Sequence, residues 1–185
     1  GDHARGLLWL SRGGGDARVM REFDLIQKDF VTGGFRLPES KSEATWKDND
    51  ALYVGTDFGP GSMTTSGYPR ICKLWRRATP LTQASLLLEV PATHLGIDIQ
   101  TVRRGGESYD VILDSLDFYH RTKHIVSGEK LQALDVPTDA DLETIFQGRA
   151  ILELRSAWKE HPQGSLVGVG LQDSSVEEIY RPATG

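Results

Sequence analysis

Cysteine is almost absent from this chain of 185 residues, which contains only Cys72. A single cysteine cannot form a disulfide within the chain, so the fold does not rest on disulfides, and either redox compartment is compatible with it. We expect a buried, inert thiol, because Cys72 alternates with its neighbours in a predicted strand. No run approaches the ~20 apolar residues of a membrane helix, and no membrane partner is predicted.

Positive charge is also scarce, with 21 Lys and Arg against 26 Asp and Glu and a formal net charge of -5. Nucleic-acid binding needs clustered basic side chains, so no nucleic-acid partner is predicted. The pairs Arg76-Arg77 and Arg103-Arg104 are interpreted as solvated strand ends. A hydrophobic content of 38% with 25% charged residues is typical of a globular domain with a core of its own.

Helical periodicity is weak, whereas alternation of period two and short β-branched or aromatic runs recur between turn residues. The chain is therefore predicted to be all-β. The predicted strands include Phe30 to Phe35, Ala51 to Thr56, Arg70 to Trp75 and Phe118 to Val126.

The predicted strands group into units of roughly 45 to 52 residues, the length of a four-stranded propeller blade. The units cover residues 39–90, 91–137 and 138–182, and residues 5–36 would form an incomplete blade without its first strand. Asn49-Asp50 and Gln147-Gly148 occupy the same place in their units, a tight turn between a first and a second strand. Residues 1–185 are thus predicted to form a partial β-propeller of about three and a half four-stranded antiparallel blades. A β-sandwich is the alternative.

An open row of blades leaves two flat apolar faces without a neighbouring blade. At roughly 25 cal/mol per Å2, exposing several hundred Å2 of such a face costs on the order of 10 kcal/mol. We therefore expect self-association, with a homodimer as one form, or refolding at the ends, or marginal stability.

No catalytic residue is identified in the sequence. A serine hydrolase of the α/β class needs a Gly-x-Ser-x-Gly turn between a strand and a helix, and the chain has none. Gly61-Ser62 and Gly164-Ser165 are interpreted as turns, and the glycine-rich segment 12–16 as a hairpin turn without a following helix.

No metal site and no cofactor are predicted. His120 and His124 would lie about 13 Å apart on one strand, too far to share a zinc ion. The carboxylates Glu177 and Glu178 are interpreted as solvated strand-edge groups. The four tryptophans are expected to fill space between blades, with a carbohydrate or peptide platform as the alternative for one of them.

The segment from Asp57 to Pro69 is the candidate binding element, because it joins two strands where a much shorter connection would do. Long ordered loops on a rigid scaffold often serve recognition. Asp57, Phe58, Tyr68 and Arg70 are the candidate substrate-binding residues. A structural role, such as supporting the next blade or a partner domain, is the alternative.

Three segments together resemble the non-catalytic propeller of bacterial prolyl oligopeptidases: Leu10 to Asp24 (LSRGGGDARVMREFD), Thr56 to Ser62 (TDFGPGS) and Ser66 to Arg70 (SGYPR). The likeness extends more loosely over residues 108–182. It implies a seven-bladed propeller that restricts peptide access to an α/β-hydrolase domain with a serine, aspartate and histidine triad, which cuts short peptides after proline. No triad motif matches a position here.

The resemblance therefore predicts the gating portion of a proline-specific serine endopeptidase, inactive by itself, with the hydrolase domain and short peptides as partners. The start at Gly1-Asp2-His3, without methionine, is interpreted as that of a cut or processed piece. The bacterial cytoplasm and periplasm are both compatible with the sequence. A separate β-rich module that binds peptides or carbohydrates is the alternative function.

Overall fold

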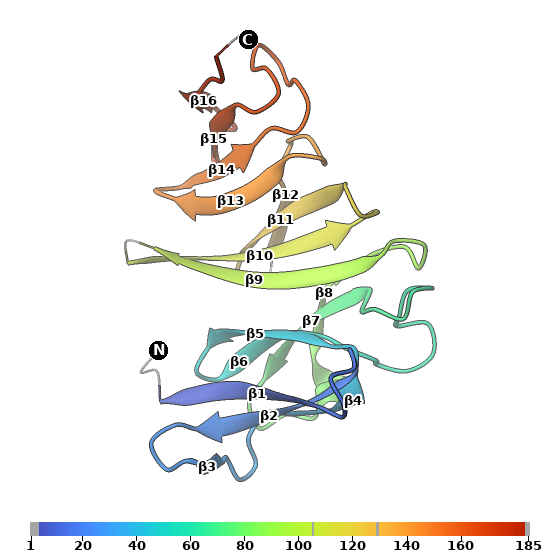
Figure 1. The fold of residues 1–185 in the computed structure, drawn as a ribbon. Helices are drawn as coiled ribbons and strands as arrows, with labels where there is room; N and C mark the ends of the chain where they lie inside the picture. The colour runs from blue at the N-terminus through green and yellow to red at the C-terminus, as the bar shows by residue number, and fades with distance from the viewer. Residues whose placement is uncertain (1–3, 105, 129, 184–185) are drawn as a thin grey trace. The chain divides into compact units, whose positions relative to one another are not determined.

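The computed structural model describes residues 4–104, 106–128 and 130–183. Over this part of the chain the regular elements are strands, apart from one 3₁₀ turn, η1 (Leu81–Gln83), which agrees with the predicted all-β class. The strands form four antiparallel sheets rather than the two sheets of a sandwich (Figure 1). No helix in the described ranges has the length and apolar character to cross a bilayer.

The strands of each sheet follow one another along the sequence. The first sheet contains β1 (Arg5–Ser11), β2 (Arg18–Asp24), β3 (Asp29–Phe30) and β4 (Arg36–Ser40), and the second contains β5 (Glu43–Asp48), β6 (Ala51–Gly55), β7 (Ile71–Arg76) and β8 (Ser85–Glu89). The third contains β9 (Gly96–Arg104), β10 (Glu107–Ser115), β11 (Arg121–Ser127) and β12 (Lys130–Ala133), and the fourth β13 (Asp141–Phe146), β14 (Arg149–Glu153), β15 (Leu166–Gly170) and β16 (Val176–Tyr180).

The chain divides into two compact units, residues 1–99 and 100–185. Unit 1 holds the first two sheets, and unit 2 holds the fourth sheet with most of the third, since the division falls within β9. The sheets span residues 5–40, 43–89, 96–133 and 141–180. The finer division into blades with boundaries near residues 36, 90 and 137 stays a prediction.

The first sheet departs from the predicted strand over Phe30 to Phe35. β2 pairs with β1 on one side, and on the other side with β3 at one end and β4 at the other. The strand β3 stops at Phe30, and the backbone turns at Gly33, whose φ is +68°. The prediction also missed β4, because Pro38 is a residue that normally argues against a strand.

The core of unit 1 lies between its two sheets. Met20 and Leu37 from the first sheet are 0% exposed, as are Leu52 and Val54 from the second. Trp46 and Trp75 fill the remaining space between the two sheets, as predicted: the Phe35 ring meets them edge-on, with centroids 5.8 Å and 4.9 Å away. Aromatic pairs at such distances add to the stabilisation that burial alone supplies.

The core of unit 2 likewise lies between its two sheets. Inward residues of the third sheet, such as Val111, pack with Ile145 and Ala150 of the fourth sheet, and all three are 0% exposed. The predicted turn Gln147-Gly148 joins β13 to β14, with φ of 48° and 71°. Two successive positive φ values match the twist of antiparallel strands in a two-residue hairpin.

Candidate functional site

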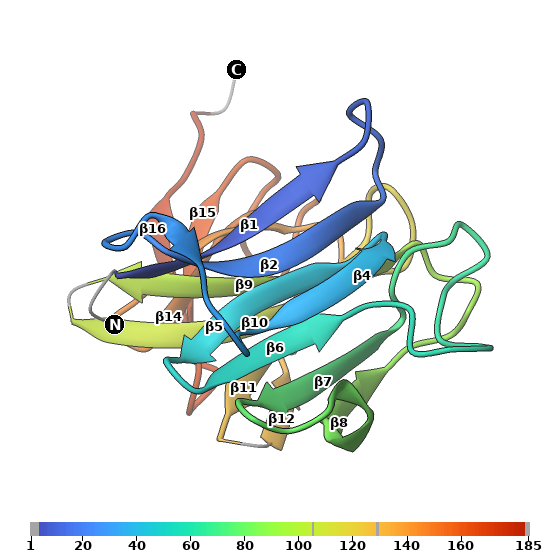
Figure 2. The same ribbon diagram turned by 90° about the horizontal axis from the view of Figure 1, so that it is seen from below.

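The connections at the two ends of each meander differ in length. Tight turns join β5 to β6 at Asn49-Asp50 and β13 to β14 at Gln147-Gly148, whereas residues 56–70 join β6 to β7 and residues 154–165 join β14 to β15. Successive connections of a meander alternate between its two ends. We call the end of each unit that carries the long connections its loop end. In unit 1 it comprises residues 12–17 and 56–70, and in unit 2 residues 116–120 and 154–165 (Figures 1 and 2).

Asp57 and Phe58 shape the start of the 56–70 connection. The Asp57 carboxylate accepts a hydrogen bond from the Gly59 amide at 2.8 Å and lies 3.1 Å from the Ser62 hydroxyl. That hydroxyl donates to the Gly59 carbonyl at 2.6 Å and accepts from the Phe58 amide at 2.8 Å. The Phe58 ring packs on the core of unit 1, with the Lys73 ammonium 4.3 Å from its centroid. Both residues therefore fold the turn.

Arg70 ties the end of the same connection to the outer strand. Its Nε donates to the Val90 carbonyl at 2.6 Å, and one terminal nitrogen donates to the Gly61 carbonyl at 2.7 Å. The other terminal nitrogen lies 2.8 Å from the Glu89 carboxylate, and the side chain is only 16% exposed. With its donors engaged in this way, Arg70 holds the connection rather than facing solvent.

Two of the four predicted residues, Phe58 and Tyr68, have large apolar side chains. Tyr68 is the more accessible of the two, at 40% exposed. Its hydroxyl donates to the Asp16 carboxylate at 3.0 Å, and the Lys41 ammonium lies 4.0 Å from its ring centroid and 3.6 Å from Asp16. A cation over an aromatic face is attracted by the ring quadrupole. The structure thus joins the β6–β7 connection to the β1–β2 turn at the loop end of unit 1.

Sequence reasoning placed the four candidate residues in one connection, where the structure has them, but it missed their partners. Asp16 lies in the glycine-rich turn that was interpreted as a plain hairpin, and Lys41 lies in the short link between β4 and β5. The only signal in the sequence for these partners was the presence of an acidic residue in the turn and a basic residue in the link. Pairing across more than 25 positions has no local signature.

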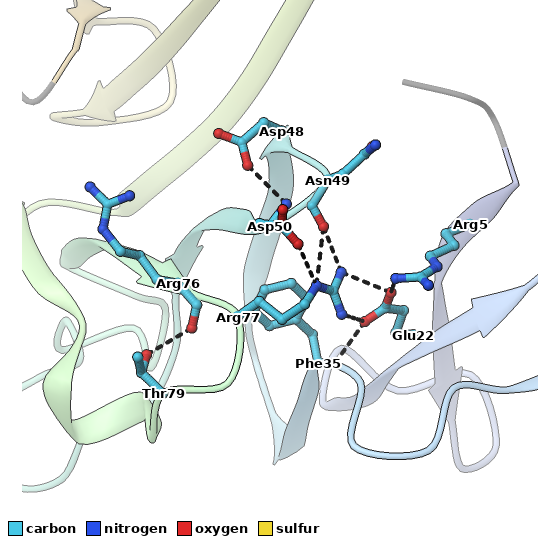
Figure 3. Close-up of polar contacts among 9 residues, drawn as sticks. All are labelled: Arg5, Glu22, Phe35, Asp48, Asn49, Asp50, Arg76, Arg77 and Thr79. Carbon is cyan, nitrogen blue, oxygen red and sulfur yellow. Dashed lines mark hydrogen bonds and ion pairs between the residues drawn. The ribbon is translucent and has the colours of Figure 1, made fainter.

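A buried ion pair joins the two sheets of unit 1 (Figure 3). The Glu22 side chain on β2 is 0% exposed, and its two carboxylate oxygens accept from the two terminal nitrogens of Arg77 at 2.9 Å and 3.0 Å. The Phe35 amide donates to the same carboxylate at 2.9 Å, and Arg5 lies 3.3 Å from it. Arg77 also donates to the Asn49 carbonyl at 2.6 Å. The prediction of solvated strand ends is wrong for Arg77, whose side chain is 22% exposed.

The charge state of Glu22 follows from these contacts. Burial by itself raises the pKa of the Glu22 carboxyl, but the hydrogen bonds from Arg77 and the Phe35 amide, with the charges of Arg77 and Arg5, outweigh it. The pKa of Glu22 lies below its ordinary value of 4.5. The carboxylate is therefore ionised at neutral pH and forms a two-point pair with the guanidinium.

A cavity of about 230 Å3 lies in unit 2 beside Lys123, and Arg121, Asp141 and Leu113 are among its lining residues. The Lys123 side chain on β11 is buried, and its ammonium donates to the carbonyls of Arg121, Pro137 and Thr138 at 3.0 to 3.2 Å. Burial lowers the pKa of Lys123 to about 8. Because three carbonyls accept hydrogen bonds from it, this ammonium joins β11 to the link that precedes β13 and is not placed as a nucleophile.

Neither the serines of the two predicted turns, Ser62 and Ser165, nor Cys72 is placed as an activated nucleophile. Ser62 serves its own turn, and the buried Ser165 hydroxyl has no hydrogen-bond partner. The His161 ring lies 2.7 Å from Glu178, while its second ring nitrogen is buried without a hydrogen-bond partner and lies 3.9 Å from the Glu160 carboxylate. Cys72 is buried as predicted, and burial raises the pKa of its thiol to about 12.

No group of three or more metal-ligating side chains occurs in residues 4–104, 106–128 and 130–183. His120 is not on a strand, since β11 begins at Arg121, and its ring hydrogen-bonds with Asp117 at 2.8 Å instead. The loop end of unit 1 offers ordered backbone groups, the exposed Tyr68 ring and the charges of Asp16 and Lys41. Such a surface can contact or exclude a peptide.

The curated proteins that this chain resembles in sequence are peptidases. No protein-family model matches the chain. An uncharacterised peptidase of Sinorhizobium fredii is 33% identical over 158 residues, which cover 82% of this chain and 22% of that protein. An uncharacterised peptidase of Rickettsia prowazekii is 32% identical over 187 residues, which cover 91% of this chain and 26% of that protein. The chain thus spans about a quarter of the length of these relatives.

Solved structures show the same partial coverage. A post-proline cleaving enzyme from Rickettsia typhi matches with a TM-score of 0.86 and 29% identity, over 97% of this chain and 30% of that one. A chain from a structural analysis of two prolyl endopeptidases matches with a TM-score of 0.72 and 14% identity, over 99% of this chain and 28% of that one, and shows the fold alone. With the four open antiparallel sheets, these matches confirm the predicted partial β-propeller.

Proposed function

Since the chain belongs to the prolyl oligopeptidase family of peptidases, we propose that it is a non-catalytic propeller portion of a proline-specific serine peptidase. It spans roughly a quarter of the length of the family members that it matches. The hydrolase domain that carries the triad is polypeptide outside these 185 residues. Short peptides are the substrates of the whole enzyme, and this portion gates their access.

The observation that carries the proposal is the match to the post-proline cleaving enzyme. It extends over 97% of this chain but only 30% of the other. This chain supplies four sheets and has no Gly-x-Ser-x-Gly segment in its sequence. A propeller can host many unrelated functions, so fold alone would not assign a role. The sequence identity of 29% and the two peptidase relatives supply the assignment to this family.

The loop end of unit 1 supports a gating role. Arg70, the Asp57 turn and the Tyr68 to Asp16 hydrogen bond hold residues 56–70 in one arrangement, and a fixed loop can exclude a large substrate by shape. Of the four candidate residues, Tyr68 is the one that we propose contacts a peptide directly, because much of its ring remains exposed. Asp57, Phe58 and Arg70 contribute by shaping the loop.

The homodimer expected from the sequence stays a prediction. It rests on the cost of leaving apolar sheet faces in water. A solution mass twice that of one chain, measured by light scattering, would support it, and a monomer mass at micromolar concentration would contradict it.

The test compares two polypeptides, this chain and the longer protein that continues into a Gly-x-Ser-x-Gly segment. We expect the longer protein to release a chromogenic group attached after proline, and a serine-directed phosphonate to abolish that activity. We expect this chain alone to release none.

Two results would overturn the proposal. One is phosphonate-sensitive cleavage by this chain alone. The other is a natural polypeptide that ends near Gly185 and binds peptides or sugars without any linked hydrolase, which would favour the separate binding module.

A further inference from the structure

The connection between β10 and β11 presents two aromatic side chains to solvent. Phe118 is 80% exposed and Tyr119 is 81% exposed, more than any other large hydrophobic side chain in the described part of the sequence. Scattered exposed apolar residues are ordinary, but two adjacent aromatic rings form a patch. Each ring can bury roughly 150 to 250 Å2 on contact with a partner.

The turn that carries the pair is held closed by its own hydrogen bonds. The Asp117 carboxylate accepts from the amides of Tyr119 and His120 at 2.7 Å and 2.9 Å and lies 2.8 Å from the His120 ring. The Leu116 amide donates to the His120 carbonyl at 2.9 Å. A preformed turn loses little conformational entropy when it docks, so the two rings are suited to an interface.

We propose that Phe118 and Tyr119 dock onto the hydrolase domain of the full-length peptidase, an inference that rests on the proposed function. The matched relatives extend far beyond the 22% to 30% of their length that this chain covers, so most of the polypeptide is available to cover the pair. A linked domain is present at a high effective concentration and covers the rings permanently. A substrate peptide would leave them exposed between turnovers.

The position of the pair agrees with that occupant. Residues 116–120 and the longer connection 154–165 are both second-to-third strand connections, and so they lie at the loop end of unit 2 (Figure 1). A neighbour that contacts this end meets ordered loops and exposed aromatic rings. At the other end of the fourth sheet it would meet the tight turn Gln147-Gly148.

Hydroxyl-radical footprinting of the full-length peptidase tests the docking. Ile26, which is 77% exposed in the turn between β2 and β3, is the internal reference. After correction for intrinsic reactivity, we expect Phe118 and Tyr119 to be modified several-fold more slowly than Ile26. If nothing covers them, their nearly equal exposed fractions predict nearly equal corrected rates.

Paired variants of the same full-length protein provide a second readout. We expect F118A/Y119A to make the link between propeller and hydrolase domain several-fold more sensitive to limited proteolysis. The matched control L25A/I26A, which also removes two exposed apolar side chains, should leave that sensitivity unchanged. Because all four side chains are at least half exposed, neither variant removes core packing.

Each alternative occupant has its own outcome, and each would overturn the docking. Protection that appears only when a proline peptide is added would indicate a substrate contact. Protection that disappears on dilution, as the mass falls from dimer to monomer, would indicate a second copy. Equal modification of Phe118, Tyr119 and Ile26 in an enzyme that cleaves proline substrates would show that nothing docks there. A full-length protein without that activity refutes the proposed function instead.

Discussion

At the residue scale, Glu22 shows how a partner distant in sequence sets the state of a side chain. It lies on β2 among residues that alternate between buried and partly buried positions, and its side chain is 0% exposed. A buried carboxylate is costly unless it is paired and hydrogen-bonded. Arg77, the Phe35 amide and Arg5 meet that requirement, and the pair joins the first and second sheets.

The variant Glu22→Gln should lower the free energy of unfolding by about 3 kcal/mol, because the Arg77 guanidinium loses a buried counter-charge. Urea unfolding followed by tryptophan fluorescence measures the change. The control is Arg5→Gln, since Arg5 is 44% exposed and its removal should cost less than about 1 kcal/mol. Equal effects of the two substitutions would contradict the assignment of Arg77 as the main partner.

The same pair predicts a pH dependence. The pKa of Glu22 is lowered below 4.5 in the folded chain, so its contribution to stability is present above about pH 4.5 and is lost as the pH falls through the folded-state pKa. The difference in unfolding free energy between the native chain and Glu22→Gln should therefore shrink below pH 4.5. A difference that stays constant down to pH 3 would show that charge is not its cause.

At the element scale, the connection 56–70 owes its arrangement to the segments that surround it. Its backbone pairs at the bridge between Met63 and Pro69, and the Thr65 amide reaches the Ala92 carbonyl in the link to β9. Gly96, the first residue of β9, has a φ of +152°, and a Cβ there would lie 2.9 Å from the Tyr68 Cβ. Glycine is therefore required for this close approach.

The variant Gly96→Ala should destabilise the chain by about 1 to 3 kcal/mol, because it combines backbone strain with a clash against Tyr68. Thermal unfolding measures the loss. Gly6→Ala on β1 is the matched control, since no atom lies within 4 Å of its Cβ position, and it should change stability little. If Gly96→Ala is as well tolerated as Gly6→Ala, the close approach of β9 to Tyr68 is not a constraint.

At the scale of the whole molecule, the gating proposal predicts that residues 56–70 help to exclude large peptides, and that this exclusion depends on the rigidity of the connection. Arg70 contacts Gly61 within the connection and Val90 and Glu89 beyond it. These contacts tie the connection to the end of β8 and so restrict the loop. Without them the barrier to larger peptides should weaken.

In the full-length peptidase, Arg70→Gln should raise kcat/KM for long peptides several-fold relative to a short chromogenic substrate. The ratio of the two rates is the measurement, since it removes any general loss of active enzyme. Arg12→Gln is the control, because Arg12 lies at the same loop end but is 92% exposed. An unchanged ratio in Arg70→Gln, with the loop demonstrably more mobile by hydrogen exchange, would contradict gating by this connection.

The sequence by itself determined the all-β class, the order of most strands, the turns at Asn49-Asp50 and Gln147-Gly148, and the burial of Cys72. These features depend on alternation and turn chemistry within a few residues, which can be read locally. The lack of a nucleophile elbow and the likeness to one peptidase family also needed no coordinates. The sequence named the connection that contains Tyr68 but not the contacts of that residue.

Only the tertiary structure decided which side chains meet. Arg77 is held by a carboxylate 55 positions away, and Tyr68 by one 52 positions away, so neither pairing leaves a local pattern. The break in the predicted strand Phe30 to Phe35 has no local pattern either. It arises because β2 pairs with two separate segments, β3 and β4. The exposure of Phe118 also depends on where β11 begins. Burial and pairing are properties of the packed chain, since they arise only when distant segments share one core.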